Sequence, residues 1–415
     1  MILHILGGGP AQLSAIRRAR EKGCRTVVSD LNPRAPGLAE ADFPSLASTF
    51  DEEAVYRDAR RFGSDVIMTT GTDQPVLTAA RVSDRLGLPY FLTPDQALRV
   101  TNKKVMKSAF REQGIPTMDF VFLKEDFREE ELASLQFPLV IKPLDSQGQR
   151  GVMIVRSPGE IRENFRRVIG YSRQEEILAE EYYPSTELTV SGWAEEGRAR
   201  ILSITDRVTV DNGPHLGVCV SHRYPSLCHH RREELDGLTQ ALTEMIGLER
   251  GPLYFQILSG KRGFRVNEIA CRLGGAYEDE FLPWMTGVPL MDIMIDMTAG
   301  RGYNCLSQEE IDRNLQDRFL SLQMFFCRPG EIGRQAGMDR VRTMEGIRGG
   351  RFLLEPGTVI RERENSTQRA GYFIVTGSSP EEVNRRIRSA YDQIVMESPA
   401  GESLIQFYKR MLFPQ

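Results

Sequence analysis

Several features that identify common classes of protein are scarce or missing in this sequence of 415 residues. The formal net charge is only −4, so the bulk composition indicates no basic surface for nucleic acid. No apolar run approaches the roughly 18 to 20 residues that a helix needs to cross a bilayer. Residues 1–6 lead straight into an expected strand, without a basic leader or a cleavage site. We therefore expect a cytoplasmic protein that binds neither nucleic acid nor a membrane.

Cysteine and histidine are also sparse, with six and five residues respectively. The cysteines have no CxxC or other metal-ligand spacing, so we expect buried thiols in a reducing compartment. Cys228 precedes His229 and His230, but adjacent side chains rarely converge on one metal ion. The sequence therefore favours neither a disulfide framework nor a zinc site.

The composition is typical of a folded chain, because 40% of the residues are hydrophobic and 27% are charged. The chain is too long for one ordinary core, so we expect two or three domains. In the first hundred residues short apolar segments alternate with helical ones, and a strand ending at Leu6 precedes Gly7-Gly8-Gly9-Pro10 and a helix. This alternation predicts a parallel, doubly wound α/β sheet.

The glycine turn permits a second interpretation together with Asp30, which ends the second expected strand. An acid in that place could hold the ribose of a dinucleotide. The dinucleotide pattern GxGxxG would need glycine at position 12, where Gln12 stands. Since a sharp strand-to-helix reversal needs such glycines anyway, a structural or substrate-side role is favoured over NAD binding.

The central region carries two lysines in positions suited to polyphosphate. Lys142 ends an expected strand, and a polar loop from Asp145 to Gly151 follows it. The lysine is a compact positive charge, and a loop with two glycines can present backbone N–H groups to phosphate oxygens. Lys103, in a helix that stops at Gly114, could reach a phosphate from the other side of a cleft. The loop is not a Walker loop, because GxxxxGK[ST] is absent.

The segment from Ile177 to Tyr183 is an expected strand that leaves a small lobe, and Glu187 follows it. The backbone of such a strand can offer C=O and N–H groups to the edge of adenine, and the acid can accept ribose hydroxyls. Taken alone, the segment is equally typical of a strand and a turn with surface carboxylates.

Two expected strands, 255–258 and 265–272, are joined by a short turn and so form an antiparallel pair. The pairing sets Gln256 beside Glu268 on one face, with Arg272 just beyond. An oxygen pair of this kind suits magnesium, which prefers hard ligands and keeps several waters. Arg272 would stabilise negative charge that develops on a phosphoryl group in transfer.

In this order, the elements resemble the ATP-grasp superfamily, whose nucleotide is clamped between two α+β lobes. The most specific segment is 266–275, with the sequence VNEIACRLGG, which is similar to the family's magnesium strand. The resemblance covers the whole length of the chain. It implies a Rossmann-like α/β domain over residues 1–98, an ATP-grasp domain over 99–300 with a lid lobe at about 115–184, and a C-terminal α+β lobe over 301–415.

The resemblance also implies the cofactors ATP and Mg2+, with Mn2+ as an alternative. It implies that ATP is bound by Lys103, Lys142, Ser146, Gly148, Gly151, Glu180, Glu181, Tyr183 and Glu187. Gln256 and Glu268 would bind the metal, and Glu268 and Arg272 would be the catalytic residues.

The sequence departs from the family at three points. A common metal-binding Glu is replaced by Gln256, a common Asn by Ala270, and the usual glycine before the ribose acid by Ser185-Thr186. The first two changes leave fewer anionic ligands. We therefore expect a second magnesium ion to be held mainly by ATP.

The resemblance implies a ligase that joins a carboxylate, an amino acid or similar small acid, to an amine through an acyl-phosphate, with release of ADP and phosphate. Segments 205–207 and 220–225 resemble L-amino acid ligases and related carboxylate–amine ligases, as does the stretch 358–383. On that basis His222, Arg223 and Arg272 would face the carboxylates of the small-molecule substrates. For His222 the alternative of a satisfied, non-catalytic histidine stays open. A homodimer is one alternative for the assembly, because many members of this family dimerise.

Three alternatives to this function stay open. A bicarbonate-using member, similar to biotin carboxylase or carboxyaminoimidazole ribonucleotide synthetase, would share every ATP-binding residue, although no biotin-carrier motif occurs in this chain. Ligation of the glycinamide ribonucleotide synthetase kind would use the same chemistry. The third is a nucleotide-binding regulatory protein without turnover, and Gln256 and Ala270 are the residues that favour it.

Overall fold

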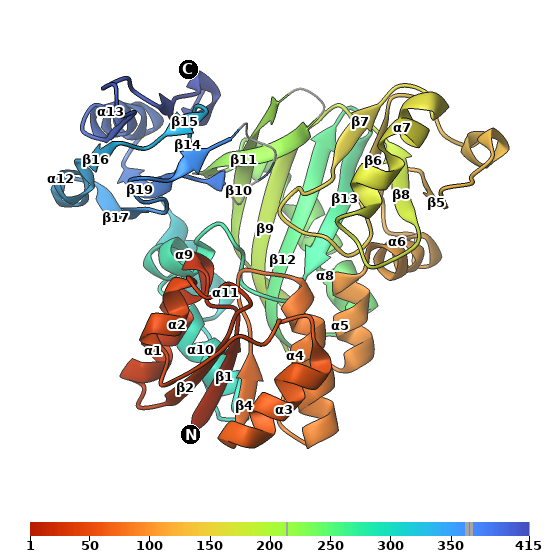
Figure 1. Ribbon diagram of the computed structural model, residues 1–415, viewed down its shortest axis with the longest axis horizontal. Coiled ribbons are helices and arrows are strands. Elements are labelled where there is room, and N and C mark those ends of the chain that lie inside the picture. Colours follow the sequence, from red (N-terminus) through yellow and green to blue (C-terminus); the bar gives the residue numbers. More distant parts are fainter. Residues whose placement is uncertain (213–214, 362–364, 366–367, 415) are drawn as a thin grey trace.

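The structure is a computed structural model that describes residues 1–212, 215–361, 365 and 368–414 (Figure 1). Within these residues a four-stranded parallel sheet and a thirteen-stranded sheet carry the fold, and two two-stranded sheets lie in the C-terminal part. Every helix of the described ranges is too short or too polar to cross a lipid bilayer. The combination of a parallel α/β part with large antiparallel sheets confirms the predicted fold class.

The N-terminal part consists of β1 (Ile2–Leu6), α1 (Leu13–Glu21), β2 (Arg25–Ser29), α2 (Pro36–Glu40), β3 (Phe43–Ser45), α3 (Glu52–Phe62), β4 (Val66–Met68) and α4 (Gln74–Leu86). Its strands are parallel in the order β3-β2-β1-β4, as the alternating segments predict. Apolar side chains of β1 lie on both faces, because successive residues of a strand point to opposite sides. Helices α3 and α4 cover one face, and α1 covers the other together with α10 (Leu290–Thr298), from the middle of the chain.

The next part comprises α5 (Pro94–Thr101), α6 (Lys103–Glu112), β5 (Phe120–Leu123), β6 (Leu139–Pro143), β7 (Met153–Val155), α7 (Pro158–Ile169) and β8 (Ile177–Glu181). Helix α6 ends as predicted, because Gly114 has a positive φ of 68°, which glycine adopts without strain. The four strands pair antiparallel, and α7 packs on them over a core that includes Leu139 and Phe165. They form a small lobe that projects at the upper right of Figure 1.

Long antiparallel strands form the large sheet at the centre, and they are β9 (Ser185–Glu195), β10 (Arg198–Asn212), β11 (His215–Tyr224), β12 (Arg250–Gly260) and β13 (Gly263–Ala270). Their order is β13-β12-β9-β10-β11, and the sheet continues through β7 into the small lobe. Helix α8 (Arg232–Ile246) covers one face over a core with Leu235 and Leu242. Alternate side chains of each strand point to the opposite face of the sheet, which α8 does not cover.

The C-terminal lobe is built on β14 (Phe319–Cys327), α12 (Met338–Thr343), β17 (Ile347–Phe352), β19 (Gly371–Gly377) and α13 (Pro380–Tyr391). Strand β14 pairs with β11 on one side and β19 on the other, so this lobe continues the large sheet. Strand β18 (Val359–Ile360) pairs with one of the short strands of this lobe. The short strands are β15 (Gly330–Glu331), β16 (Arg334–Ala336), β20 (Val395–Glu397) and β21 (Ile405–Gln406).

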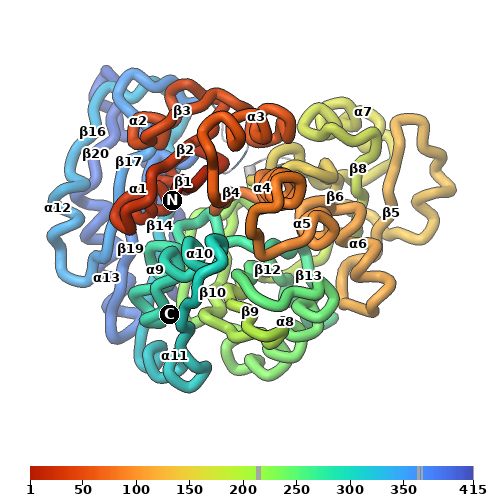
Figure 2. The backbone as a smooth tube through the Cα atoms, turned by 90° about the horizontal axis from the view of Figure 1, so that it is seen from below, coloured from red at the N-terminus to blue at the C-terminus, as the bar shows by residue number. Residues whose placement is uncertain are grey.

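Some helices have no counterpart among the predicted elements, notably α9 (Glu278–Thr286), α10 and α11 (Gln308–Leu315). Helix α10 shows the reason, because seven of its nine residues are buried. The polar stripe of this helix is narrow, because it consists of Asp292 and Asp296, which pair with Arg18 of α1 and with Lys22 just after it. Seen from below in Figure 2, the N-terminal helices lie between the small lobe and the C-terminal lobe, so three parts of the chain surround one region.

Candidate active site

A large cavity of about 1060 Å³ opens where the N-terminal sheet, the small lobe, the large sheet and the C-terminal lobe meet. Its floor is the face of the large sheet opposite α8, and it is also lined by loops of the N-terminal part and by residues of the C-terminal lobe. All the predicted site residues line it except Gly151 and Arg223. The tertiary structure therefore gathers in one place the side chains that the sequence analysis singled out separately.

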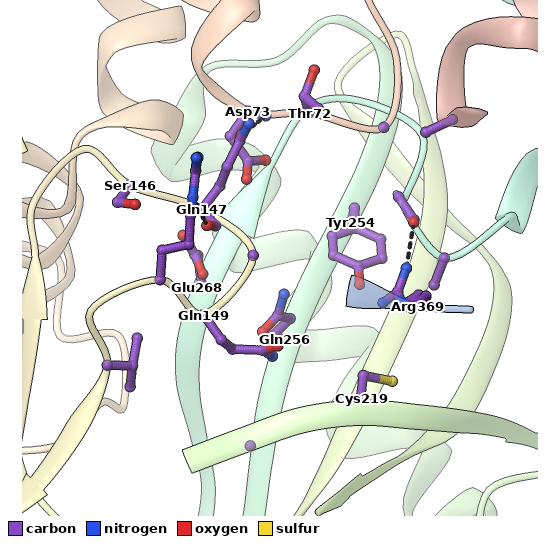
Figure 3. A pocket seen from close by; sticks show the side chains of 18 of the residues that line it. Thr72, Asp73, Ser146, Gln147, Gln149, Cys219, Tyr254, Gln256, Glu268 and Arg369 are labelled. Carbon is purple, nitrogen blue, oxygen red and sulfur yellow. Dashed lines mark hydrogen bonds between the residues drawn. The ribbon is translucent and has the colours of Figure 1, made fainter. Parts of the chain in front are cut away.

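The predicted pair on the two adjacent strands is formed, since Gln256 and Glu268 are direct partners between β12 and β13. Both point into the cavity (Figure 3). Arg272 lies just beyond β13, donates from Nε to Asp73 Oδ1 at 2.6 Å and forms an ion pair with the same oxygen through Nη2 at 2.5 Å. Asp73 follows β4 and precedes Arg272 by 199 residues in the sequence, so no local sequence pattern indicates this partner.

A buried ion-pair cluster surrounds the start of α6 and the end of β6. Glu180 is 1% exposed and contacts both Lys107, at 2.9 Å, and Lys142. Burial alone would raise the pKa of Glu180, but the ammonium groups of Lys107 and Lys142 outweigh it and hold that pKa at about 2. Lys103 contacts Glu268 Oε1 at 2.9 Å and donates to the Ser146 carbonyl at 2.9 Å. We call this part of the cavity, around Lys103, Lys142 and Glu268, the phosphate end.

Positive charge exceeds negative charge at the phosphate end. The cations of Lys103, Lys107, Lys142 and Arg272 face the carboxylates of Asp73, Glu180 and Glu268. Burial raises the pKa of Asp73, and it would raise that of Glu268 too, but the Lys103 ammonium outweighs it and lowers the Glu268 pKa. An excess of buried cationic groups suits an anionic ligand such as a polyphosphate.

The polar loop after β6 reaches the N-terminal part. Gln147 Oε1 accepts the N–H of Asp73 at 2.5 Å and that of Gln74 at 3.4 Å. Ser146 Oγ and Gln149 Oε1 are buried and have no hydrogen-bond partner among the described residues. Such orphaned polar atoms cost stability unless a ligand or water satisfies them, so they mark a place for a polar ligand.

Gly151 does not line the cavity, contrary to its expected role in phosphate binding. A Cβ atom there would lie 2.9 Å from the ring of Tyr171 and 3.3 Å from Pro143, and φ is +73°. Gly151 is therefore needed for packing behind the loop and for its backbone conformation. Gly148, with φ of +67°, does lie at the cavity.

The strand expected to meet adenine is β8 with the residues after it. Glu180 lines the cavity, but its carboxylate is engaged by the two lysines. Glu181 Oε1 accepts the N–H of Gln136 at 3.0 Å, and the Tyr183 hydroxyl donates to the Gly263 carbonyl at 2.8 Å. The side chains of Glu181 and Tyr183 are therefore engaged in contacts within the protein, near the junction of the small lobe and the large sheet. The backbone of this segment remains as the group that could face adenine.

Glu187, the expected ribose acid, is paired with Arg207 on the neighbouring strand β10. Arg207 in turn lies opposite His222 of β11. His222 Nδ1 is 2.9 Å from Thr205 Oγ1, and its Nε2 is buried without a partner in the described structure. Burial, followed by the charges of Arg207 and Arg369, holds the pKa of His222 well below its usual value, so the ring is neutral.

Arg223 does not reach the cavity, so the expected contact with substrate is not supported. Its guanidinium contacts Asp206 at 3.2 Å and donates to the Leu412 carbonyl at 2.5 Å. Adjacent strand residues point to opposite faces, so His222 and Arg223 cannot both line the floor. A register shift between β10 and β11 brings Cys219 and His222 to the cavity, three residues apart.

Several functional residues were missed by the sequence analysis. Lys107 lies four residues after Lys103 on α6, so helical periodicity could have found it. Asn267, which accepts from Lys142 Nζ at 2.9 Å, is adjacent to the predicted Glu268. Arg369 lines the cavity from the C-terminal lobe and donates to the Gly275 carbonyl at 3.1 Å, a contact with no local sequence signal.

The N-terminal glycine turn also lines the cavity. Asp30 is already used there, because its Oδ2 accepts the N–H of Gly8 and its Oδ1 that of Asn32, both at 2.8 Å. Gln12 packs under Gly7, and its Nε2 donates to the Thr70 carbonyl at 2.5 Å. The geometry supports a structural or substrate-side role for this turn.

Comparison with protein families finds two matches in this chain. Residues 135–279 match the ATP-grasp domain, and residues 323–397 match the L-amino acid ligase C-terminal domain 2. The first covers Lys142, Glu180 and both metal-binding candidates but not the lysines of α6, and the second covers most of the C-terminal lobe.

Among curated proteins, the chain is 25% identical to the formate-dependent phosphoribosylglycinamide formyltransferase of Synechocystis sp. over 46% of this chain and 51% of that protein. It is 24% identical to the phosphoribosylamine–glycine ligase of Methanocaldococcus jannaschii over 66% of this chain and 68% of that protein. The chain thus spans about half of the first relative and about two thirds of the second.

Solved structures share the fold over almost the whole chain. The L-amino acid ligase from Bacillus licheniformis has a TM-score of 0.79 at 19% identity, covering 96% of this chain and 98% of that one. The biotin carboxylase domain of the Hydrogenobacter thermophilus 2-oxoglutarate carboxylase, solved with MgADP and bicarbonate, has a TM-score of 0.76 at 19% identity, covering 97% and 91%. At such identities the similarity establishes the fold.

Proposed function

This chain contains an ATP-grasp domain followed by an L-amino acid ligase C-terminal domain 2, and on that premise we propose that it is an ATP- and magnesium-dependent carboxylate–amine ligase. The carboxylate substrate is an amino acid or a similar small acid. The observation that carries the proposal is the phosphate end, where Gln256 and Glu268 adjoin a buried cluster of cations inside one cavity.

The residues at the phosphate end fit a magnesium–nucleotide complex. Glu268 and Gln256 supply two adjacent oxygen ligands, and the described residues contain no group of three or more His, Cys, Asp or Glu side chains that could hold a metal ion. The remaining magnesium ligands would be phosphate oxygens and water, a donor set that this ion favours. Lys103 and Lys142 would contact the phosphates, and Ser146 would satisfy its orphaned hydroxyl there.

When bound, ATP would supply the phosphoryl group that converts an unreactive carboxylate into a better electrophile. The role of the protein would be to position the reactants and to stabilise charge. Arg272 is suited to this role, because a hydrogen bond and an ion pair to Asp73 hold its guanidinium at the cavity wall. Its Cζ also lies 4.7 Å from the centre of the Tyr254 ring, which restricts its movement further.

Contacts between the small lobe and the N-terminal part support a closed cavity that excludes water. Gln147 bonds to Asp73, as described above. Arg173, from the loop before β8, contacts Asp145 at 3.1 Å and lies 4.2 Å from the centre of the Phe50 ring in the N-terminal part. Exclusion of water protects an acyl-phosphate from hydrolysis until an amine attacks it.

A second candidate is a carboxylase that uses bicarbonate. It is favoured by the similarity to a biotin carboxylase domain that was solved with bicarbonate, over 97% of this chain. Bicarbonate is itself a carboxylate-like acceptor of the phosphoryl group, so the phosphate end serves both candidates equally.

The test is release of ADP from Mg-ATP in the presence of single amino acids, pairs of amino acids, or bicarbonate. Release that requires two amino acids supports the ligase, and release with bicarbonate alone supports the carboxylase. The variant Glu268→Ala is the control for contaminating ATPase activity. Glu234→Ala, which changes an exposed residue of α8, is the matched surface variant. ATP binding without release across the whole panel would contradict both candidates and favour a regulatory protein.

A further inference from the structure

The cavity has a second end, away from Glu268 and next to the C-terminal lobe. It is lined by Cys219, Tyr254, Tyr277, Leu353, Leu354 and Arg369. In Figure 3, Arg369 and Cys219 lie on the other side of Gln256 and Tyr254 from Ser146 and Gln147. We call this the carboxylate end, for the reasons that follow.

Arg369 has no carboxylate partner in the described structure. Its Nη1 donates to the Gly275 carbonyl at 3.1 Å, and its Nε is buried without a hydrogen-bond partner. Two other arginines of the cavity floor and wall, Arg207 and Arg272, are each paired with an acid. A guanidinium with a buried, unsatisfied N–H beside a cavity is best satisfied by an anionic ligand that accepts two parallel hydrogen bonds.

One candidate for an internal partner is Glu278, but only one oxygen of its carboxyl group makes a hydrogen bond, and that bond does not involve Arg369. Its Oε2 accepts the N–H of Ala276 at 2.7 Å, and Gly274 leaves the space that its carboxyl group fills. Burial raises the pKa of Glu278, with opposing contributions from backbone hydrogen bonds and from Arg272 and Arg369. No ion pair joins Glu278 to Arg369 among the residues that the structure describes.

A second unsatisfied polar atom belongs to this end of the cavity, namely Nε2 of the neutral His222. The remaining wall is aromatic and aliphatic, with Tyr254, Tyr277 and two leucines. Tyr277 is held by stacking on Tyr372, with ring centroids 3.7 Å apart and planes at 12°. A guanidinium with an unsatisfied N–H, a neutral ring and an apolar wall suit a carboxylate on a small body. Arg410, which donates to the Thr209 carbonyl at 2.7 Å, also lines the cavity.

We propose that Arg369 binds the carboxylate of the amine-bearing substrate, the carboxylate that is not consumed in the reaction, and that this substrate is an α-amino acid. The reacting carboxylate must lie near the phosphoryl group, Arg272 and Glu268, so an anion held at the carboxylate end belongs to the other substrate. Its assignment as the amine component rests on the proposed function. The binding of a carboxylate at Arg369 can be tested without turnover.

The experiment is calorimetric titration of the full chain, with magnesium and a non-hydrolysable ATP analogue present, against the proteinogenic L-amino acids and their carboxamides. We expect at least one acid to bind roughly tenfold to a hundredfold tighter than its carboxamide, since a hydrogen-bonded charge is lost in the amide. In Arg369→Met this preference should disappear. Arg369→Lys, which keeps the charge but not the planar fork, should retain part of it and also covers the case in which the Met variant does not fold.

The matched control is Arg348→Met, an exposed arginine on β17 that does not line the cavity, and it should keep the full preference. The proposal is overturned if no acid is preferred over its amide, if Arg369→Met keeps the preference, or if ribose 5-phosphate binds more tightly than every acid. ADP release measured in parallel separates the two proposals. A chain that binds acids through Arg369 but releases no ADP would refute the ligase alone.

Discussion

The two ends of the cavity differ in how their arginines are held. At the phosphate end, Arg272 makes an ion pair and a short hydrogen bond with Asp73, and every lysine of the cluster contacts an acid. At the carboxylate end, Arg369 contacts a backbone carbonyl and keeps a buried N–H unsatisfied within the described residues. On the proposed function, the first arrangement would stabilise charge that develops during the reaction, and the second would be completed by a ligand. The two arginines come from different parts of the chain, since Arg272 follows β13 and Arg369 belongs to the C-terminal lobe.

The largest expected effect tests the phosphate end directly. Glu268→Ala should lower the rate of ADP release by about a hundredfold to a thousandfold, because it removes the one acidic ligand of the expected metal pair. Steady-state ADP release measures it, and the preference for acids over amides should persist in the same variant. Near-normal release would mean that the metal is held elsewhere, and the distinction between the two ends would fail.

The buried ion pair of Lys107 and Glu180, next to the phosphate end, should contribute strongly to the free energy of unfolding. Lys107→Met should lower the free energy of unfolding by about 3 kcal/mol, because Lys107 and Glu180 are each 1% exposed and the charge of Glu180 loses one partner. Urea denaturation measures the change, with the exposed Lys124→Met as the matched control. A change as small as that of the control would show that Lys142 alone compensates Glu180.

Acid should weaken the same cluster in a specific pH window. The lysines lower the pKa of Glu180 from 4.5 to about 2, so this carboxylate contributes stability above pH 4.5 that is lost as the pH falls toward 2. Glu180→Gln should therefore flatten the fall in the free energy of unfolding over this window. Parallel curves for the wild type and the variant would contradict the lowered pKa.

Loss of the Asp73 carboxylate should leave Arg272 without its acidic partner, and in this respect the phosphate end would resemble the carboxylate end. Asp73→Asn should lower kcat by roughly tenfold to a hundredfold with little change in KM for ATP, because Asp73 acts by positioning Arg272. Asp73→Glu should recover part of the loss, which a purely structural defect would not do. An equal loss of both kinetic constants, or no recovery, would assign Asp73 a different role.

The smallest expected effect concerns closure over the phosphate end. Gln147→Ala removes the hydrogen bonds to the N–H groups of Asp73 and Gln74 and should raise KM for ATP roughly twofold to tenfold. Binding of amino acids at the carboxylate end should be unchanged in calorimetry. A parallel loss at both ends would show that the small lobe closes over the whole cavity.

Features whose causes lie within a few residues of sequence could be predicted, and features that depend on distant parts of the chain could not. The pairing of Gln256 with Glu268 could be predicted because a short turn joins β12 to β13 and sets their register. The end of α6 could be predicted from Gly114, and the parallel sheet from alternating segments. Helix α10 was not predicted, because seven of its nine residues are buried and its polar stripe is reduced to Asp292 and Asp296.

The division of the chain at residues 98 and 300 stays a proposal, since β14 pairs with β11 and ties the C-terminal lobe into the large sheet. The error at Arg223 has a clear physical cause. Alternation allows only one of two neighbouring residues to face the cavity, and a register shift in β11 decides which one. No feature of the sequence marks that shift.

The sequence by itself determined the elements whose causes lie within a few residues: the glycine turn, the hairpin with the metal candidates, and the lysines at a helix start and a strand end. Only the tertiary structure decided which charges are compensated. Asp73 reaches Arg272 across 199 residues, while Arg369 approaches Gly275 without meeting an acid. An ion pair depends on distance in space and on burial, and neither quantity is encoded by spacing along the chain.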